Sequence, residues 1–202
     1  MRCSKPYAAC AVFFLLLQPA ILFAGTLQPH RAHPHQRVYL LRGFLNVFSL
    51  GMDQLADELR QRGIEAVVAN HTLSGLYANE AIRDCKAGLI SSIAIVGHSL
   101  GATAGVDMAE QLAQAGVAVG LVVTVDPITL TAAPGNVKRL ENFYISDGVG
   151  KTVQRGPDFH GSLQNIDLKN NAGLGHVSIA NSEHVHQQVL KFVAAAATSR
   201  CK

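Results

Sequence analysis

Ser99 has the surroundings of a reactive serine. It lies at the centre of Gly97–Gly101, whose sequence is GHSLG, between the apolar run Ile93–Val96 and a helical pattern that begins at Ala102. A strand that turns sharply into a helix holds a serine in a strained turn, and flanking glycines let neighbouring backbone pass closely. The helix N-terminus offers N–H groups to a developing oxyanion. The pattern predicts a nucleophile; the alternative is a tight turn whose serine only caps the helix.

The elements that would position Ser99 follow from hydrophobic periodicity. From Arg37 onward, apolar runs of strand length alternate with helical patterns. We expect strands at Val38–Leu41, Ala66–Ala69, Ile93–Val96, Leu121–Val125 and Phe143–Ile145, with Leu163–Leu168 as an edge strand, and helices at Met52–Arg62, Leu76–Lys86, Ala102–Ala115 and Ser182–Ala197. This alternation predicts an α/β fold in which a mainly parallel sheet of about six strands is flanked by helices. Residues 37–202 are expected to form one domain.

Three motifs in this order resemble the α/β-hydrolase superfamily, which includes lipases, cutinases, carboxylesterases and thioesterases. They are Gly97–Gly101, Val123–Pro127 (VTVDP) and Gly173–His176 (GLGH), and the resemblance covers about Arg37 to Val193. It implies a minimal hydrolase fold and a catalytic triad in the chain order serine, acid, histidine. In such a triad the histidine takes the proton of the serine and the carboxylate orients the histidine, without a metal or organic cofactor.

The resemblance leaves two candidates for the acid. Asp126 follows the run Leu121–Val125 and precedes Pro127, as in the acid-bearing turn of certain lipases and thioesterases. Asp147 follows the next strand, where most superfamily members carry their acid. Asp126 is the preferred acid and Asp147 the alternative.

The histidine expected from the resemblance is His176. It ends a glycine-rich segment between the last predicted strand and the last predicted helix. His160 precedes that strand, and His184 and His186 fall within the helical pattern, although His184 is the main alternative. His98, next to the nucleophile, is expected to be a packed polar residue rather than a base.

Two backbone N–H groups should form the oxyanion hole. The resemblance implies the N–H of Leu100 and one from Arg42–Leu45, for which we expect Phe44. Arg42 departs from the common lipase pattern, because a His-Gly pair often begins there. Phe44 or Leu45 would also line the acyl pocket.

These motifs favour serine-dependent hydrolysis of a carboxylic ester or thioester, with a small molecule as substrate. The alternatives are an acyltransferase with the same triad and a non-catalytic exported binding protein on the hydrolase fold. No long insertion follows the fourth predicted strand, where lids commonly enter. We therefore expect an open site that prefers short, soluble substrates. The sequence does not define an oligomeric state.

The first 24 residues are predicted to be a signal peptide. Arg2 and Lys5 precede the apolar stretch Ala8–Leu17, and cleavage is expected after Ala24. The protein would then be exported, periplasmic or secreted; an uncleaved membrane anchor is the alternative. Residues 25–36 are expected to be a solvated linker rather than a metal-binding tract, although they contain His30, His33 and His35.

Export would change both the charge and the state of the cysteines. Loss of Arg2 and Lys5 lowers the formal net charge from +3 to +1, so the basic balance gives no reason to expect a nucleic acid partner. Cys85 and Cys201 remain after cleavage. In an oxidising compartment they would form either a disulfide that ties the C-terminal tail to the domain or two free thiols.

Overall fold

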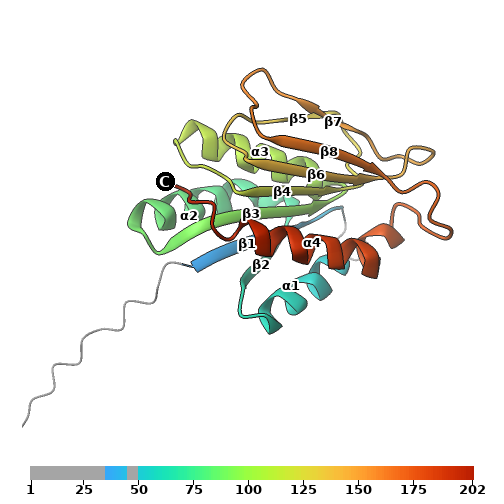
Figure 1. Ribbon diagram of the computed structural model, residues 1–202, viewed down its shortest axis with the longest axis horizontal. Helices are drawn as coiled ribbons and strands as arrows, with labels where there is room; N and C mark the ends of the chain where they lie inside the picture. Colours follow the sequence, from blue (N-terminus) through green and yellow to red (C-terminus); the bar gives the residue numbers. More distant parts are fainter. Residues whose placement is uncertain (1–34, 45–49) are drawn as a thin grey trace, which may run out of the picture. The chain divides into compact units, whose positions relative to one another are not determined.

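The computed structural model describes residues 35–44 and 50–202. Six parallel strands form one sheet in the order β2-β1-β3-β4-β6-β8 (Figure 1). Their bounds are β1 His35–Arg42, β2 Glu65–Asn70, β3 Ile90–His98, β4 Leu121–Val125, β6 Arg139–Tyr144 and β8 Ser162–Asp167. The predicted α/β class and parallel sheet are confirmed, with β8 at one edge. A second sheet of two short parallel strands, β5 (Thr131–Ala133) and β7 (Val153–Arg155), was not predicted.

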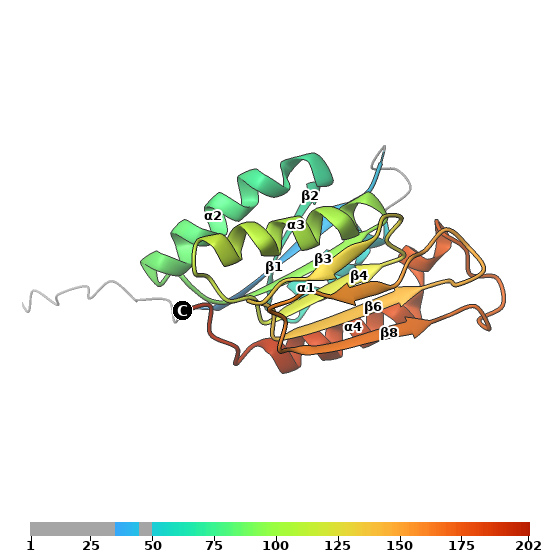
Figure 2. The ribbon, with the colours of Figure 1, turned by 90° about the horizontal axis from the view of Figure 1, so that it is seen from above.

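Within the described residues, four α-helices cover the two faces of the sheet. Figure 2 shows α2 and α3 on one face and α1 and α4 on the other. Their bounds are α1 Gly51–Gln61, α2 Ser74–Ala87, α3 Leu100–Gln114 and α4 Glu183–Ala196, within two residues of the predicted ends. Two 3₁₀ turns, η2 (His71–Leu73) and η3 (Ser178–Asn181), lie next to α2 and α4 and were not predicted.

Alternation along the strands supplies a hydrophobic core on each face. In β1, Tyr39 and Leu41 pack with residues of α2 and α3, whereas Val38 and Leu40 pack with residues of α1 and α4. All five residues of β4 are buried, as expected for a central strand covered on both sides. Burial of a large aliphatic side chain contributes about 1.5–3 kcal/mol, so this double core fixes the register of the strands.

The first strand begins earlier than predicted. The expected linker extended to Gln36, but β1 starts at His35, because polar side chains hold these residues in the fold. His35 and Arg37 pair with Glu65 of β2. Gln36 is buried, and its Nε2 donates to the carbonyl oxygen of Val193 in α4, 3.0 Å away. The signal peptide prediction and the rest of the linker, residues 1–34, lie outside the described residues.

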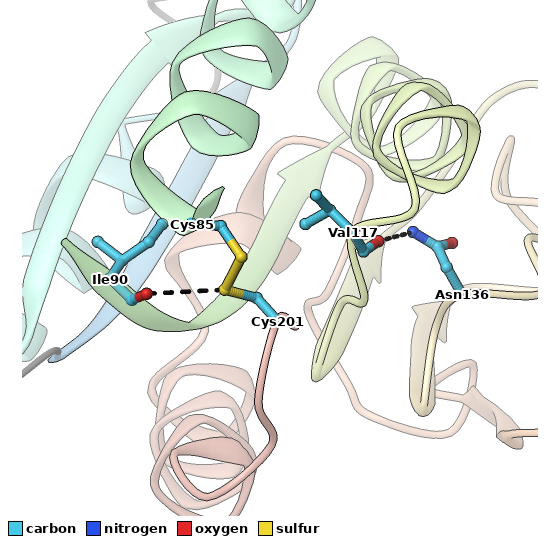
Figure 3. The surroundings of a disulfide bond; sticks show 5 residues. All are labelled: Cys85, Ile90, Val117, Asn136 and Cys201. Carbon is cyan, nitrogen blue, oxygen red and sulfur yellow. Dashed lines mark hydrogen bonds between the residues drawn. A yellow bond between two sulfur atoms is a disulfide. The ribbon is translucent and has the colours of Figure 1, made fainter. Parts of the chain in front are cut away.

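A disulfide joins the end of α2 to the C-terminal tail (Figure 3). Cys85 and Cys201 are both buried, and their Cα atoms lie 6.2 Å apart. Cys201 Sγ is 3.7 Å from the carbonyl oxygen of Ile90, and the Cys201 N–H donates to the carbonyl of Ser91. The bridge therefore fastens the tail beside the start of β3 and decides between the two alternatives for these cysteines.

A side-chain hydrogen bond near this bridge fixes the chain after α3. Figure 3 also shows Asn136, whose Nδ2 donates to the carbonyl oxygen of Val117 at 2.8 Å.

Within residues 35–44 and 50–202, no helix is long and apolar enough to cross a membrane.

Candidate active site

Ser99 makes the turn between β3 and α3 by itself. β3 ends at His98 and α3 begins at Leu100, and the serine between them has φ 58° and ψ −122°. Such a backbone conformation costs about 1–3 kcal/mol in a residue with a side chain and is often found at functional sites. The Ser99 N–H donates to the carbonyl of Val125 at 2.9 Å, which ties the turn to β4. The Ser99 side chain makes no capping hydrogen bond to α3, which speaks against the alternative of a serine that only caps the helix.

The glycines beside Ser99 are required by close backbone contacts. A Cβ at Gly97 would lie 2.1 Å from the carbonyl oxygen of Gly101. A Cβ at Gly101 would lie 2.1 Å from the carbonyl oxygen of Leu41 in β1. Neither contact leaves room for a side chain, which agrees with the close approach predicted from the GHSLG motif.

The structure brings Ser99, His176 and Asp126 together. His176 Nε2 lies 2.9 Å from Ser99 Oγ, and His176 Nδ1 lies 2.7 Å from Asp126 Oδ2. An ionised carboxylate only accepts hydrogen bonds, so Nδ1 carries the proton and donates to Asp126. Nε2 is then the acceptor for the Ser99 hydroxyl. This is the orientation that a base needs to take a proton from a serine.

The Asp126 carboxylate is fully buried and held on both oxygens. Asp126 directly follows β4 and has a positive φ of 47°. While Oδ2 accepts from His176, Oδ1 accepts from the Ile145 N–H at 3.0 Å. Gly150 packs against the same oxygen, since a Cβ there would lie 1.9 Å from Oδ1. Asp126 therefore has one geometry available to it.

The alternative residues lie elsewhere. Asp147 is exposed in the loop after β6, and Asp126 occupies the ring nitrogen that Asp147 would have needed. Exposed His184 lies on α4, and His160 is exposed before β8. His186 is buried on α4, where its ring nitrogens contact Glu58 Oε1 at 2.9 Å and the Ala180 carbonyl oxygen at 2.8 Å.

Both predicted oxyanion donors, Leu100 and Phe44, lie within the described residues. Leu100 is the first residue of α3, and the first N–H groups of a helix have no intrahelical acceptor. Phe44 lies just beyond β1 with its side chain 62% exposed. Leu45 lies outside the described residues. The assignment of Leu100 and Phe44 as oxyanion donors stays a prediction.

His98 contacts the histidine across the site. Burial lowers the pKa of His98 to about 4, because the ring loses its hydration, although the hydrogen bond to the His176 backbone opposes this. His98 Nε2 lies 2.7 Å from the His176 carbonyl oxygen, and the two ring centroids are 5.0 Å apart. The sequence predicted a packed polar residue here but did not identify its partner.

A buried polar ladder, which sequence reasoning missed, supports the segment around Gly150. Thr124 Oγ1 donates to Asn142 Oδ1 at 2.8 Å, and Asn142 Nδ2 donates to the Lys151 carbonyl oxygen at 3.0 Å. The Lys151 N–H donates to the carbonyl of Pro127, directly after the acid. The sequence signal that could have revealed this ladder is a polar residue in each of two apolar strands, Thr124 and Asn142, which are register partners.

In the described part of the chain, no group of three or more His, Cys, Asp or Glu could hold a metal ion.

Comparisons with known proteins concern the fold. No family model and no curated protein matches the chain. Among solved structures, the chain is similar to Est1E from Butyrivibrio proteoclasticus, with 11% identity over 83% of this chain and 90% of that chain and a TM-score of 0.53. It is also similar to the ydeN gene product from B. subtilis, with 12% identity over 79% of this chain and 99% of that chain and a TM-score of 0.51. A protein from Xanthomonas campestris pv. campestris assigned to the alpha/beta superfamily of hydrolases shares 14% identity over 79% and 96% of the two chains, with a TM-score of 0.46.

The strand order agrees with the likenesses to Est1E and the ydeN product. The chain runs from β1 to β2 on one side and then to β3 on the other, so the strand order reverses between β1 and β3. Ligands of open α/β sheets bind at such a point, beyond the carboxyl ends of the strands, and Ser99 follows β3 there. The protein has the predicted α/β fold, a parallel sheet flanked by helices, and it shares this fold with Est1E and the ydeN product.

Proposed function

We propose that the protein is a serine hydrolase that cleaves a small carboxylic ester or thioester through an acyl-enzyme. The observation that carries the proposal is the chain of contacts from Ser99 Oγ through the His176 ring to the buried Asp126 carboxylate. A non-catalytic binding protein would need neither a strained serine nor a histidine oriented toward it.

The geometry supports a two-step reaction. Ser99 Oγ attacks the substrate carbonyl carbon while His176 Nε2 takes the hydroxyl proton, and Asp126 stabilises the imidazolium that forms. The Leu100 and Phe44 N–H groups would bind the carbonyl oxygen as it becomes negative. His176 then gives its proton to the departing alcohol or thiol, which leaves the acyl group on Ser99. Water, deprotonated by His176, attacks the ester carbonyl and restores the serine hydroxyl.

Exposed apolar side chains favour a substrate with an apolar part. Phe44, Val149 and Val177 are 62%, 50% and 45% exposed, and they follow β1, β6 and His176. Since the carboxyl ends of parallel strands share one edge of the sheet, all three belong to the edge that carries Ser99. We propose that they contact the acyl or alcohol group of the substrate. Between β4 and β6, where the sequence left no room for a lid, the described chain holds only the short strand β5 and no helix, so the proposed substrate remains short and soluble.

We also propose that the protein is exported. The basic and apolar leader supports this, as does a structural disulfide, because disulfides persist mainly in oxidising compartments.

A fluorophosphonate probe, which reacts covalently with activated serines, tests the proposed function. The wild type should be labelled and Ser99→Ala should not. Ser162→Ala, at an exposed serine that begins β8, is the matched control and should be labelled like the wild type. An unlabelled wild type, or equal labelling of Ser99→Ala, would reject the proposal. Hydrolysis of p-nitrophenyl esters and acyl-CoA thioesters, with and without an added alcohol acceptor, then separates esterase, thioesterase and acyltransferase.

A further inference from the structure

His98 links the strand that carries the nucleophile to the segment that carries the base. It is 1% exposed and directly precedes Ser99 in β3. Its Nε2 lies 2.7 Å from the His176 carbonyl oxygen. A carbonyl oxygen only accepts, so Nε2 carries the proton and His98 is the donor.

The segment around His176 has little packing of its own. Residues 171–173 are exposed, residues 174–176 are only partly buried, and Gly173 has a φ of 82°. Local hydrogen bonds close it, among them Gly175 N–H to Ser178 Oγ at 2.9 Å. Such a segment opens more easily than the sheet, and His98 joins its backbone to the sheet's interior.

The bond places the two reacting groups relative to each other. The His98 side chain binds the main chain of His176, and the neighbouring Ser99 side chain contacts the imidazole of His176. Small errors in this distance are costly, because proton transfer in the transition state needs near-contact geometry. The neutral state of the His98 ring helps, since burial lowers its pKa to about 4 and so no second cation faces the His176 imidazolium.

We infer that His98 is a positioning residue, which holds the His176 backbone by its Nε2–H so that the imidazole meets Ser99. This role rests on the proposed function. His98 does not contact the reacting atoms; it acts through His176. Its loss should therefore lower kcat and leave KM nearly unchanged.

The test compares two replacements of similar size. His98→Leu fills the buried space without a donor, and His98→Gln places an amide N–H near the original Nε2. We expect His98→Leu to lower kcat for p-nitrophenyl acetate, and the rate of fluorophosphonate labelling, at least tenfold, with KM within about twofold. His98→Gln should recover most of both losses. His160→Gln, at an exposed histidine before β8, should match the wild type.

Three outcomes would overturn the assignment. They are a folded His98→Leu with kcat within twofold of the wild type, an equal loss in His98→Leu and His98→Gln, and a loss that resides in KM. Should His98→Leu not fold, His98→Asn replaces it, because its amide is one methylene shorter and falls short of the carbonyl. If His98→Asn were then as active as His98→Gln, the assignment would be overturned.

Amide hydrogen exchange keeps this inference separate from the proposed function. His98→Leu should speed exchange in residues 173–178, with no change in α2. That result does not depend on catalysis. An unlabelled wild type rejects the hydrolase, whereas a labelled wild type with unchanged exchange and kcat in His98→Leu rejects only the role of His98.

Discussion

Gly150→Ala should disable the proposed site although no triad residue is replaced. Gly150 is buried in the loop after β6, and a Cβ there would lie 1.9 Å from Asp126 Oδ1 and 2.8 Å from its Cγ. The position of a Cβ is fixed by the backbone, so no rotamer of alanine relieves this contact. The carboxylate must move, and it then loses the Ile145 N–H at 3.0 Å, the His176 ring at 2.7 Å, or both.

The size of the effect follows from what the carboxylate does. Replacement of the triad carboxylate in a serine protease lowers kcat about 10⁴-fold, because the histidine adopts the wrong tautomer. Displacement of a carboxylate that remains present should cost no more than this. We expect kcat to fall about 10²- to 10⁴-fold in Gly150→Ala, which raises the barrier by about 3–5 kcal/mol. KM should change little, because no group that binds substrate is altered.

Gly148→Ala is the matched control. It lies in the same loop, and its Cβ would meet nothing closer than 3.4 Å, an ordinary contact with the Ile145 carbonyl oxygen. Neither Gly148 nor Gly150 has a positive φ, so alanine does not strain the backbone at either position. Both variants are compared by circular dichroism, p-nitrophenyl acetate hydrolysis and the rate of fluorophosphonate labelling. A folded Gly150→Ala with kcat within threefold of Gly148→Ala would refute the role assigned to Asp126.

Three further predictions concern stability and substrate. A histidine in the unfolded chain takes up a proton near pH 6.5, but native His98 does so only near pH 4. The unfolded state therefore binds more protons between these two values. The stability that neutral His98 contributes is present above pH 6.5 and is lost as the pH falls to 4. Urea unfolding at pH 7 and pH 4 should show about 3 kcal/mol less acid destabilisation in His98→Gln than in the wild type, and equal losses would contradict this. Cys201→Ser should cost about 2–4 kcal/mol in unfolding free energy, because the bridge closes a separation of 116 residues, yet leave kcat unchanged; a changed kcat would show coupling to the site. Soluble p-nitrophenyl acetate or butyrate should react faster than emulsified long-chain triglyceride, and the reverse preference would contradict an open site.

The fold was readable from sequence because its strands are buried by helices on both sides. A run such as Leu121–Val125 is apolar at every position, and β4 has the predicted bounds. β5 and β7 have three residues each, of which only one is buried in each strand, so no periodicity marks them. The start of β1 was missed for a related reason. His35 and Gln36 are polar, and the residues that hold them in the strand are distant in sequence: Glu65 and Val193 bind their side chains, and β3 pairs with their backbone.

The acid shows where sequence reasoning reaches its limit. Asp126 and Asp147 follow β4 and β6, which are neighbours in the sheet, so local pattern places both at the same edge. Burial and contacts separate them. Asp126 has a positive φ of 47° and a buried carboxylate, which accepts from the N–H of Ile145. Ile145 belongs to the segment that leads to Asp147. The residue directly after β6 therefore supplies a donor to the acid that follows β4, whereas Asp147, two residues further on, is exposed.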